Sequence, residues 1–561
     1  MKPALLLFCG LISIPAFALK TYNVVSSGAV GNGSTVNTTA IQKAIDSCTV
    51  TGGIVEVPSG TFVTGTIILK NNVNLQIDSG AVLEGSGSIS DYPSMTKSFS
   101  SAFFTLATLI YADSASNIAI TGKGTINGNG SSIAFLLSSN KSKRPFGIWL
   151  VSCRNVQIKN VTLENSAYWM LHPMNCDSVA ILNVTISNHA NSNNDGIDVD
   201  GCRNVWITGC NIDAFDDAIS PKTTFDGTCS NVIIKHCNLA SWSNDIRFGT
   251  ESWGTIKNLL MDSCTFSEST FSGSSPATAG INMGEENGGS MDSITISNIT
   301  MTGVATPMVL RLEDQGVAYS TGIPFKDDGT FSNVNIENIT ATASSNITST
   351  ISGVPNTYMQ NIALKNIAIT FPGGFPAVRN SFVLPEDSTV ETAGNMYGDT
   401  IPAYGFFVRH VKNISMENVC FTWGTTDKRP ILYFTDVLSS TGLPVDTSAF
   451  KVYSGGVNTD CIDSTALSVN NIELQNKDIR VYPNPSKGIF NLQANSQWPI
   501  ANSHVEIYNV LGEKVYMALM PQTPKGALTT IDLSNQNVGV YFYRIISAQG
   551  EVLGTGKLVI E

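Results

Sequence analysis

The chain has 561 residues, of which only 14 % are charged, and its formal net charge is −12. A nucleic-acid-binding protein usually carries a basic surface, so this charge argues against that class. The length is enough for two or three domains of roughly 100 to 200 residues each. Glycines and short polar stretches interrupt the apolar alternations along the whole chain, which predicts an all-β protein.

The N-terminal stretch MKPALLLFCGLISIPAFA has the features of an export signal. A lysine precedes an apolar run, and the small residues Ala16 and Ala18 mark a cleavage site. No later stretch reaches the roughly 18 continuous apolar residues that a membrane span needs. We therefore expect residues 1–18 to be a signal peptide and the mature protein to be secreted or held at the cell surface.

A short helix is expected next, in NTTAIQKAIDSC. Asn37 or Thr38 is the candidate N-cap, and apolar residues follow at helical spacing. These apolar residues are Ala40, Ile41, Ala44 and Ile45. A helix at this place would cover the open edge of a β-sheet structure that begins after it.

One phrase of alternating apolar residues then recurs along the chain. It reads NVQIKNVTLEN from Asn155, SVAILNVTISN from Ser178, NVWITGCNIDA from Asn204 and NVIIKHCNLAS from Asn231, and further copies follow. These starts are 23 to 27 residues apart. The alternation predicts strands, and the period is that of one coil of a parallel β-solenoid, whose coils bury their apolar edges by stacking.

The repeat register sorts most cysteines into two columns, one six residues after a phrase start and one two residues before it. The columns are Cys210, Cys237 and Cys264, and Cys153, Cys176, Cys202 and Cys229. Free cysteine is a common small buried residue, so we expect both columns inside the solenoid rather than in disulfides or on a metal. Cys420 and Cys461 fall outside the columns, and whether they pair stays open.

The repeat stops after about residue 465. RVYPNPSKGIFNL, VEIYNVLGEKVYMAL and GVYFYRIISAQGEVLGTGKLVIE then alternate as strands with glycine-containing turns, which is typical of a small β-sandwich. We therefore expect a solenoid at 19–465, a linker at 466–478 and a sandwich at 479–561.

Three aspartates are expected to crowd one spot on the solenoid. Aligning the coils through their inward isoleucines puts Asp195, Asp217 and Asn244 in one column, with Asp216 beside it. Strands on neighbouring coils lie roughly 4.8 Å apart, and carboxylates that close raise the pKa of at least one of them. An acid and a base in one site are what glycosidic hydrolysis needs. Turn-capping aspartates and a calcium site are the alternatives.

More polar residues are expected on the same face. The next column holds His172, Asp198, Ser220, Arg247, Asn282 and Arg311, one step further come Asp200, Lys222 and Glu313, and Tyr168 and Trp169 lie one coil away. Such a stripe suits an extended sugar chain, because arginine and lysine bind its carboxylate or sulfate groups. The two aromatic residues are candidates to stack on a sugar ring.

Two motifs resemble glycoside hydrolase family 28, the polygalacturonase family. NNDGID at 193–198 is similar to its N-x-D motif and FDDAISPKT at 215–223 to its double-aspartate motif, and the N-terminal coils resemble this family as well. The resemblance implies a right-handed parallel β-helix and hydrolysis with inversion, without a metal or cofactor. It makes Asp216 the general acid, and Asp195 and Asp217 the pair that positions and deprotonates the water.

Two further motifs of the family are changed. Where polygalacturonases carry G-H-G, the chain has S-N-D at 243–245, and where they carry R-I-K it has G-I-N at 280–282. The family's histidine and basic pair, which help to bind the substrate carboxylate, are therefore missing from these positions. Either Arg247, Lys222 and Arg311 supply the cations from other coils, or the sugar is different.

The C-terminal segments VYPNPSKGIF, IYNVLGEKVY, GVYFYRI and KLVIE resemble the sorting domain of the type IX secretion system of Bacteroidetes. The resemblance implies export in two steps, with the tail as the part that the secretion machinery recognises. A carbohydrate-binding or adhesive sandwich is the alternative.

The sequence thus predicts a secreted, monomeric hydrolase of a pectic galacturonan or a related uronate-containing polysaccharide. A hydrolase of a sulfated or neutral galactan and a non-catalytic glycan-binding surface protein stay open as alternatives. So does a calcium-dependent lyase, in which Asp195, Asp198 and Asp217 hold the metal and Arg247 takes the proton. The mode of attack, from the chain end or within the chain, depends on loops, and the insertions after Ser320 and Phe371 are the candidates.

Overall fold

The computed structural model describes residues 20–99, 102–271, 278–313, 329–375, 401–464, 479–494, 504–509, 514–519, 528–546 and 552–561. The expected signal peptide and linker lie outside these residues, as do residues 314–328 and 376–400, which hold most of the two insertions. The chain divides into two compact units, 1–464 and 465–561. None of the helices in the described ranges is long and apolar enough to cross a membrane.

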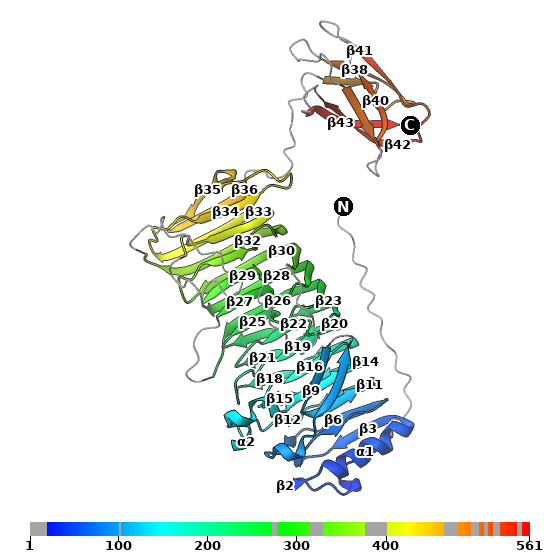
Figure 1. The fold of residues 1–561 in the computed structure, drawn as a ribbon, viewed down its shortest axis with the longest axis vertical. Helices are drawn as coiled ribbons and strands as arrows, with labels where there is room; N and C mark the ends of the chain where they lie inside the picture. Colours follow the sequence, from blue (N-terminus) through cyan, green and yellow to red (C-terminus); the bar gives the residue numbers. More distant parts are fainter. Residues whose placement is uncertain are drawn as a thin grey trace. The chain divides into compact units, whose positions relative to one another are not determined.

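The first unit is a parallel β-helix, as predicted. Each coil contributes one strand to each of three walls, and each strand pairs in parallel with its counterparts in the coils before and after it. Figure 1 shows the coils stacked from the blue N-terminal strands to the yellow strands near residue 430. Isoleucine, valine and leucine alternate inward, so the core runs along the axis of the unit.

The wall that carries the candidate site, called the site wall below, consists of β5 (Ile67–Ile68), β10 (Thr108–Asp113), β13 (Phe146–Val151), β16 (Leu171–Met174), β19 (Ile197–Asp200), β22 (Ile219–Lys222), β25 (Asn244–Phe248), β27 (Ala279–Glu285), β29 (Thr306–Leu312), β31 (Ser349–Ser352) and β34 (Leu432–Leu438). The second wall consists of β1 (Thr21–Asn23), β3 (Gly53–Val57), β6 (Val73–Ile77), β11 (Ser116–Gly122), β14 (Arg154–Lys159), β17 (Asp177–Leu182), β20 (Arg203–Thr208) and β23 (Thr228–Lys235). The third wall consists of β2 (Asn32–Val36), β4 (Gly60–Thr64), β7 (Ala81–Gly85), β12 (Thr125–Asn127), β15 (Thr162–Glu164), β18 (Thr185–Asn188), β21 (Asn211–Ala214) and β24 (Asn238–Ser241). Longer strands then run through the second and third walls: β26 (Thr255–Glu268), β28 (Ser290–Val304), β30 (Thr330–Ala343) and β32 (Met359–Gly373), while β33 (Phe406–Thr425) also pairs with the site wall.

The asparagines that open the repeated phrase form a ladder between coils. Asn204, Asn231 and Asn258 have φ of 56°, 56° and 53°, in the left-handed region that asparagine tolerates better than most residues. The side-chain amide of Asn231 donates to Asn204 over 3.0 Å, and that of Asn258 donates to Asn231 over 3.4 Å. These three residues, called the asparagine ladder below, explain why the phrase begins with asparagine: the backbone takes a left-handed conformation at this point of each strand, and the stack satisfies the amides.

Helix α1 (Thr38–Thr51) lies where a helix was predicted. It buries Ile41, Ala44 and Ile45 and contacts the first strands of the second wall. Asn37 is its N-cap residue, but the side chain makes no capping bond to the helix. Its amide oxygen instead accepts from the backbone N–H of Val30 over 2.7 Å, so Asn37 fastens the preceding turn.

Both predicted cysteine columns are confirmed. The eight free cysteines of the described residues are all buried, and neighbouring members of a column touch. The backbone N–H of Cys153 lies 3.3 Å from the sulfur of Cys176, and that of Cys176 lies 3.2 Å from the sulfur of Cys202. Cys420 and Cys461, left open by the sequence, form a disulfide between β33 and β36 (Thr459–Ser464), which pair in antiparallel fashion together with β35 (Phe450–Gly456).

A β-hairpin that the sequence analysis did not predict packs on the outside of the site wall. Its strands, β8 (Met95–Phe99) and β9 (Ala102–Leu106), form a two-stranded sheet of their own. Phe104 packs with Tyr111 of β10 and Trp149 of β13, and the ring of Phe99 stacks on Phe225 with centroids 4.5 Å apart. Figure 1 shows the hairpin in blue, lying against coils that come later in the sequence.

The second unit is a β-sandwich, as predicted. One sheet contains β37 (Ile479–Tyr482), β38 (Ile489–Ala494) and β41 (Leu528–Asp532), and the other contains β40 (Lys514–Leu519), β39 (His504–Tyr508), β42 (Gly539–Ile546) and β43 (Val552–Ile560). Side chains of both sheets meet in one core, among them Phe490, Ile507 and Leu558.

Candidate active site

Three carboxylates meet at the N-terminal edge of the site wall, where β19 and β22 begin. Ile197 pairs with Ile219, and the backbone N–H of Gly196 donates to the carbonyl oxygen of Asp217 over 2.9 Å, so Asp195 and Asp217 occupy the same place on adjacent coils. Asp195 and Asp217 are only 3 % and 9 % exposed. Asp216 is half-buried, and its backbone is held by Asn194 and Ser241. The alignment through the inward isoleucines therefore identified the neighbours correctly.

The crowding perturbs the titration of the group, as expected for like charges in a buried site. Burial and the nearby charge of Asp216 raise the pKa of Asp217 to about 7. Burial and the charges of Asp198 and Asp216 raise the pKa of Asp195 well above its usual value. Carboxylates this close share their protons. The cluster therefore retains protons at pH values where isolated aspartates are ionised.

An amide relay runs from the carboxylates along the wall. The amide of Asn244 donates to Asp217 Oδ1 over 2.6 Å, and the amide of Asn282 donates to Asn244 Oδ1 over 3.0 Å. Asn244 and Asn282 are 5 % and 1 % exposed, and the oxygen of Asn282 has no hydrogen-bond partner among the described residues. The two asparagines that replace family motifs thus orient Asp217 rather than supply a positive charge.

Lys222 is the cation of this site. Its amino nitrogen lies 2.9 Å from Asp198, 3.9 Å from Asp195 and 3.2 Å from Glu251, an acid that the sequence analysis did not single out. It also lies 3.8 Å above the ring of Trp169. Burial acts to lower the pKa of Lys222, but the three carboxylates outweigh it and raise that pKa well above the usual value. The lysine therefore stays protonated, and the neighbouring carboxylates balance its positive charge.

His172 and Trp169 are structural rather than open to a ligand in this conformation. His172 is 1 % exposed, and its Nε2 is hydrogen-bonded to Asp200 over 3.0 Å. Asp200 also accepts from the backbone and hydroxyl of Thr224. Trp169 is 4 % exposed, beneath Lys222. Tyr168, half-buried, is the aromatic residue of the predicted pair that keeps accessible surface.

Arg311 does not stand in the column where the sequence analysis placed it. Asn282 pairs with Val309, and Arg311 pairs with Gly284, two residues further along the strand. The inward residue of this coil is Met308, which pairs with Ile281, so Arg311 lies three residues after the inward position rather than one. Arg311 contacts Glu313 over 2.8 Å. Arg247 does lie beside Asn282, but it is paired with Glu286.

Arg144 is a further residue that the sequence did not reveal. It comes from the segment after helix α2 (Ile133–Leu136), outside the repeat, and is 3 % exposed. It donates to the backbone oxygen of Ser192, and to Asn193 Oδ1 over 3.2 Å, and so holds the loop that leads into Asp195. Its guanidinium also lies 4.6 Å from the centre of the Tyr168 ring. No sequence pattern links it to this loop, because 48 residues separate Arg144 from Ser192.

The arrangement offers proton transfer from and to carboxylates, but it is poorly suited to hold calcium. The ammonium group of Lys222 lies between Asp195 and Asp198, where the lyase alternative needs the metal. Within the described ranges no three histidine, cysteine or acidic side chains are grouped as a metal site. Hydrolysis by an acid and a base needs none.

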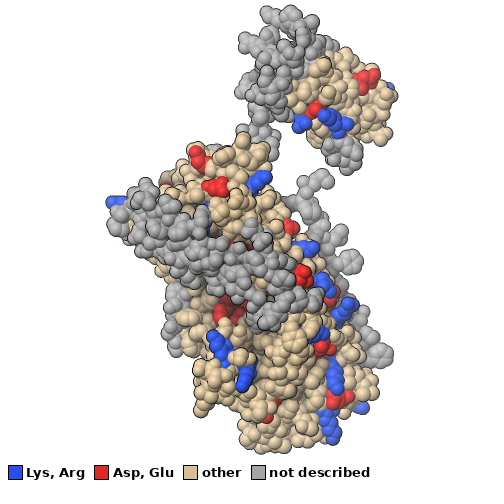
Figure 2. All heavy atoms as spheres, viewed as in Figure 1, with Lys and Arg blue, Asp and Glu red and all other residues tan. Residues whose placement is uncertain are grey.

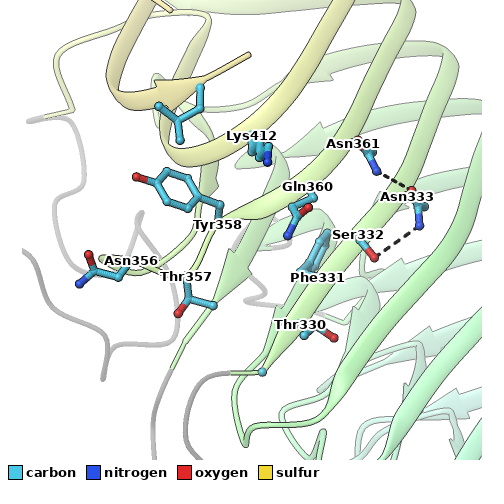
Figure 3. Close-up of a pocket in the computed structure, with 12 residues that line it drawn as sticks. Thr330, Phe331, Ser332, Asn333, Asn356, Thr357, Tyr358, Gln360, Asn361 and Lys412 are labelled. Atoms are coloured by element: carbon cyan, nitrogen blue, oxygen red, sulfur yellow. Dashed lines mark hydrogen bonds between the residues drawn. The ribbon is translucent and has the colours of Figure 1, made fainter. Parts of the chain in front are cut away.

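A separate pocket of about 650 Å³ lies over β30 and β32, in the third and fourth coils after β23 (Figure 3). Its wall includes Asn333 and Asn361, which are hydrogen-bonded to each other over 2.8 Å, while Tyr358 donates to Asp436. These asparagines belong to the repeat, at the same turn as the asparagine ladder. The described residues that line it include no pair of carboxylates, in contrast to the first site.

Comparison with known proteins gives two family assignments. The profile of "Glycosyl hydrolases family 28" matches residues 48–383, and that of "Secretion system C-terminal sorting domain" matches residues 480–561. A probable polygalacturonase of Vitis vinifera is 33 % identical over 218 residues, covering 36 % of this chain and 44 % of the relative. An exo-poly-alpha-D-galacturonosidase of Dickeya chrysanthemi is 32 % identical over 252 residues, covering 36 % and 42 %. The matched part is thus less than half of the length of these relatives.

Solved structures support the fold. A family 28 exopolygalacturonase of Yersinia enterocolitica superposes with a TM-score of 0.59 at 20 % identity, covering 76 % of this chain and 79 % of that one. An exopolygalacturonase of Thermotoga maritima gives 0.56 at 20 % identity, covering 72 % and 92 %.

Proposed function

The chain belongs to glycosyl hydrolases family 28, and we propose that it is an inverting hydrolase of a uronate-containing polysaccharide, with pectic galacturonan as the first candidate. The observation that carries the proposal is the register that places Asp195 and Asp217 on adjacent coils, with Asp216 beside them. The relatives named as polygalacturonases support the substrate class. The sorting domain makes the protein an exported one, secreted or at the cell surface.

In the proposed reaction Asp216 is the general acid. It is the most exposed of the three carboxylates, so a glycosidic oxygen can reach it. It donates its proton to that oxygen while the bond from the oxygen to the anomeric carbon breaks, and the leaving sugar departs as an alcohol. Asp195 and Asp217 hold a water on the opposite face and take one proton from it. The water oxygen bonds to the anomeric carbon, and the configuration inverts.

The shared protons of the cluster supply this acid. The raised pKa values of Asp195 and Asp217 mean that the three groups are not all ionised at neutral pH. A proton carried by one carboxyl can be used by another in a coupled cluster. Lys222 keeps its positive charge beside Asp195. It therefore favours the state in which Asp216 carries the proton and Asp195 and Asp217 are ionised.

Two observations weigh against the lyase alternative. Lys222 lies where the calcium would be needed. Arg247, the proposed base of that mechanism, is buried against Glu286, and an arginine paired with a carboxylate holds its proton firmly.

The test uses the full chain and polygalacturonate, with and without a chelator. New reducing ends are measured together with the ultraviolet absorbance of unsaturated uronate, and the first anomer formed is identified by proton NMR. Hydrolysis predicts reducing ends without absorbance, unchanged by the chelator, and an inverted first product. Absorbance that requires calcium would establish the lyase, and a retained anomer would contradict the assignment of Asp195 and Asp217 to water. Absence of cleavage on polygalacturonate, with cleavage of a rhamnogalacturonan or a sulfated galactan, would correct the substrate alone.

A further inference from the structure

A cavity of about 610 Å³ lies between the hairpin and the 3₁₀ helix η3 (Ser138–Lys143). Its walls include Phe103 and Thr105 of β9, Phe146 at the start of β13, and Tyr168. Phe103 is 52 % exposed. Open aromatic rings beside hydroxyl groups are typical of a pocket for a small polar ligand with apolar faces, such as a sugar.

The cavity adjoins the carboxylates. Tyr168 belongs to the coil directly before Asp195, since the backbone N–H of Met170 donates to the carbonyl oxygen of Asp195 over 3.1 Å. Burial and then the charges of Asp195 and Glu251 raise the pKa of Tyr168 to about 12, so the ring lies within their electrostatic reach. A sugar in this cavity would therefore be a neighbour of a sugar at the carboxylates.

The charged side chains in the wall of the cavity are both cations. Arg144 is buried, and its hydrogen-bond acceptors are all neutral oxygens, on Lys141, Ala167, Ser192 and Asn193. Neither it nor the exposed Lys141 makes an ion pair with any residue that the structure describes. A buried cation without a counter-charge is unfavourable. An anion in the cavity would supply the missing charge.

The other cations near the site differ in this respect. Lys222, Arg247 and Arg311 each contact a carboxylate of the protein itself. On the face drawn in Figure 2, basic and acidic side chains are interspersed, with no continuous field of one sign. A net charge of −12 also repels a polyanion at long range. Recognition of an anionic sugar must therefore be local, and the cavity offers two cations that have no carboxylate partner among the described residues.

The hairpin covers the outer surface of the site wall beside this cavity. Phe104 covers Trp149 and Tyr111, which face outward on β13 and β10, and Trp149 is 0 % exposed. A polysaccharide that follows the wall from the carboxylates toward the N-terminal coils thus meets packed side chains one coil beyond Tyr168. A polysaccharide therefore cannot continue along the wall beyond the cavity.

From these contacts we infer that the cavity binds the terminal sugar of the substrate through its carboxylate, with Lys141 as the anion-binding residue, and that small products are released from chain ends. The inference rests on the proposed function and names the substrate end that the site takes. Phe103 and Tyr168 offer ring faces to the sugar, and Arg144 supplies a fixed positive charge behind it.

The first test is binding, which does not depend on turnover. Trigalacturonate is titrated by calorimetry into the full chain carrying Asp216→Asn, alone and combined with Lys141→Ala or Lys143→Ala. Lys143 is the matched control, because it is an exposed lysine of the same helix η3 that does not line the cavity. Lys141→Ala should weaken binding about tenfold, in line with the loss of one charge-assisted hydrogen bond, and Lys143→Ala should leave it unchanged. The carboxyl-reduced trisaccharide should show no difference between the two. Equal affinities for trigalacturonate would overturn the assignment of Lys141.

The second test is the product pattern of the wild-type chain on polygalacturonate at low conversion. A single small product from the start, with little loss of viscosity, is expected. A ladder of oligomers with a rapid fall in viscosity would show that chains pass through the site, and the closed end would then be wrong although the hydrolase remains. If no reducing ends form, polygalacturonate is not the substrate. The binding test would still decide the role of Lys141.

Discussion

Two of the sets of asparagines that hydrogen-bond from coil to coil in this protein have opposite roles. The asparagine ladder lies within β20, β23 and β26, where its members are exposed or half-buried, and each amide meets the asparagine of the neighbouring coil. Asn244 and Asn282 form the same kind of amide contact, but they are buried, and their chain ends on Asp217. Residues that follow the repeat build the scaffold, whereas residues that interrupt it build the site. Substitutions in the two sets should therefore separate stability from activity.

The largest effect is expected from Asp216→Asn, which removes the proposed acid and keeps the shape. Activity should fall roughly 1,000-fold, the middle of the range for a general acid, while the melting temperature stays near that of the wild type because the side chain is half-buried. Asp177→Asn is the control, since Asp177 accepts from Asn204 of the asparagine ladder and is the first residue of β17. If both variants lose activity, or neither does, Asp216 is not distinguished from a structural carboxylate, and its assignment as the acid would be contradicted.

Asn244→Ala should come next and act through Asp217. The hydrogen bond from Asn244 lowers the pKa of Asp217, which stands at about 7 against the raising effects of burial and Asp216. Its loss should reduce kcat about 30-fold, as for a hydrogen bond to a charged group. It should also move the acidic limb of the pH–rate profile to higher pH. A fall in kcat with an unmoved limb would mean that Asn244 acts only through packing.

The third prediction concerns pH and stability. Asp217 has a raised pKa in the folded protein, so the folded state binds its proton more tightly than the unfolded state does, and this contribution is lost as the pH rises from about 4 to about 7. Asp217→Asn should therefore stabilise the protein at pH 8 by on the order of 4 kcal/mol and leave it unchanged near pH 4. Asp177 has a pKa lowered by its bond to Asn204, so Asp177→Asn should give no such gain. Calorimetric unfolding at both pH values measures the difference.

The smallest effect is expected in the ladder. Asn231→Ala removes two amide contacts and puts a less tolerant residue at a φ of 56°. The free energy of unfolding should fall by about 1 kcal/mol, with kcat unchanged. Asn231→Gly, which adopts this φ freely, should recover part of the loss. A change in kcat would show that the ladder is coupled to the site.

The repeat made most of the β-helix predictable. Inward isoleucines such as Ile197 and Ile219 fix the register, because a shift by one residue would expose them. The same register brought Asp195, Asp217 and Asn244 together. It failed at Arg311, because the residue that pairs with Ile281 is Met308 and Arg311 therefore lies two residues beyond the expected position.

The parts of the site that lie outside the repeat could not be predicted. The hairpin and η3 have no phrase to align, so nothing in the sequence placed Phe104 over Trp149 or Lys141 beside Tyr168. Glu251, one of the three carboxylate partners of Lys222, was missed for a related reason. Glu251 comes from a turn after β25, where side-chain direction depends on the local fold rather than on strand alternation. The roles of these residues in binding stay predictions.

The buried cysteine columns can report where the β-helix unfolds first. Cys153, Cys176, Cys202 and Cys229 lie in successive coils and are fully shielded from solvent, so a thiol reagent reaches each of them only when its coil separates from a neighbour. Timed alkylation followed by mass spectrometry would then read the order of unfolding along the axis without any engineered label. The same shielding means that, for an exported protein, coil stacking has to be complete before oxidants can join the wrong thiols.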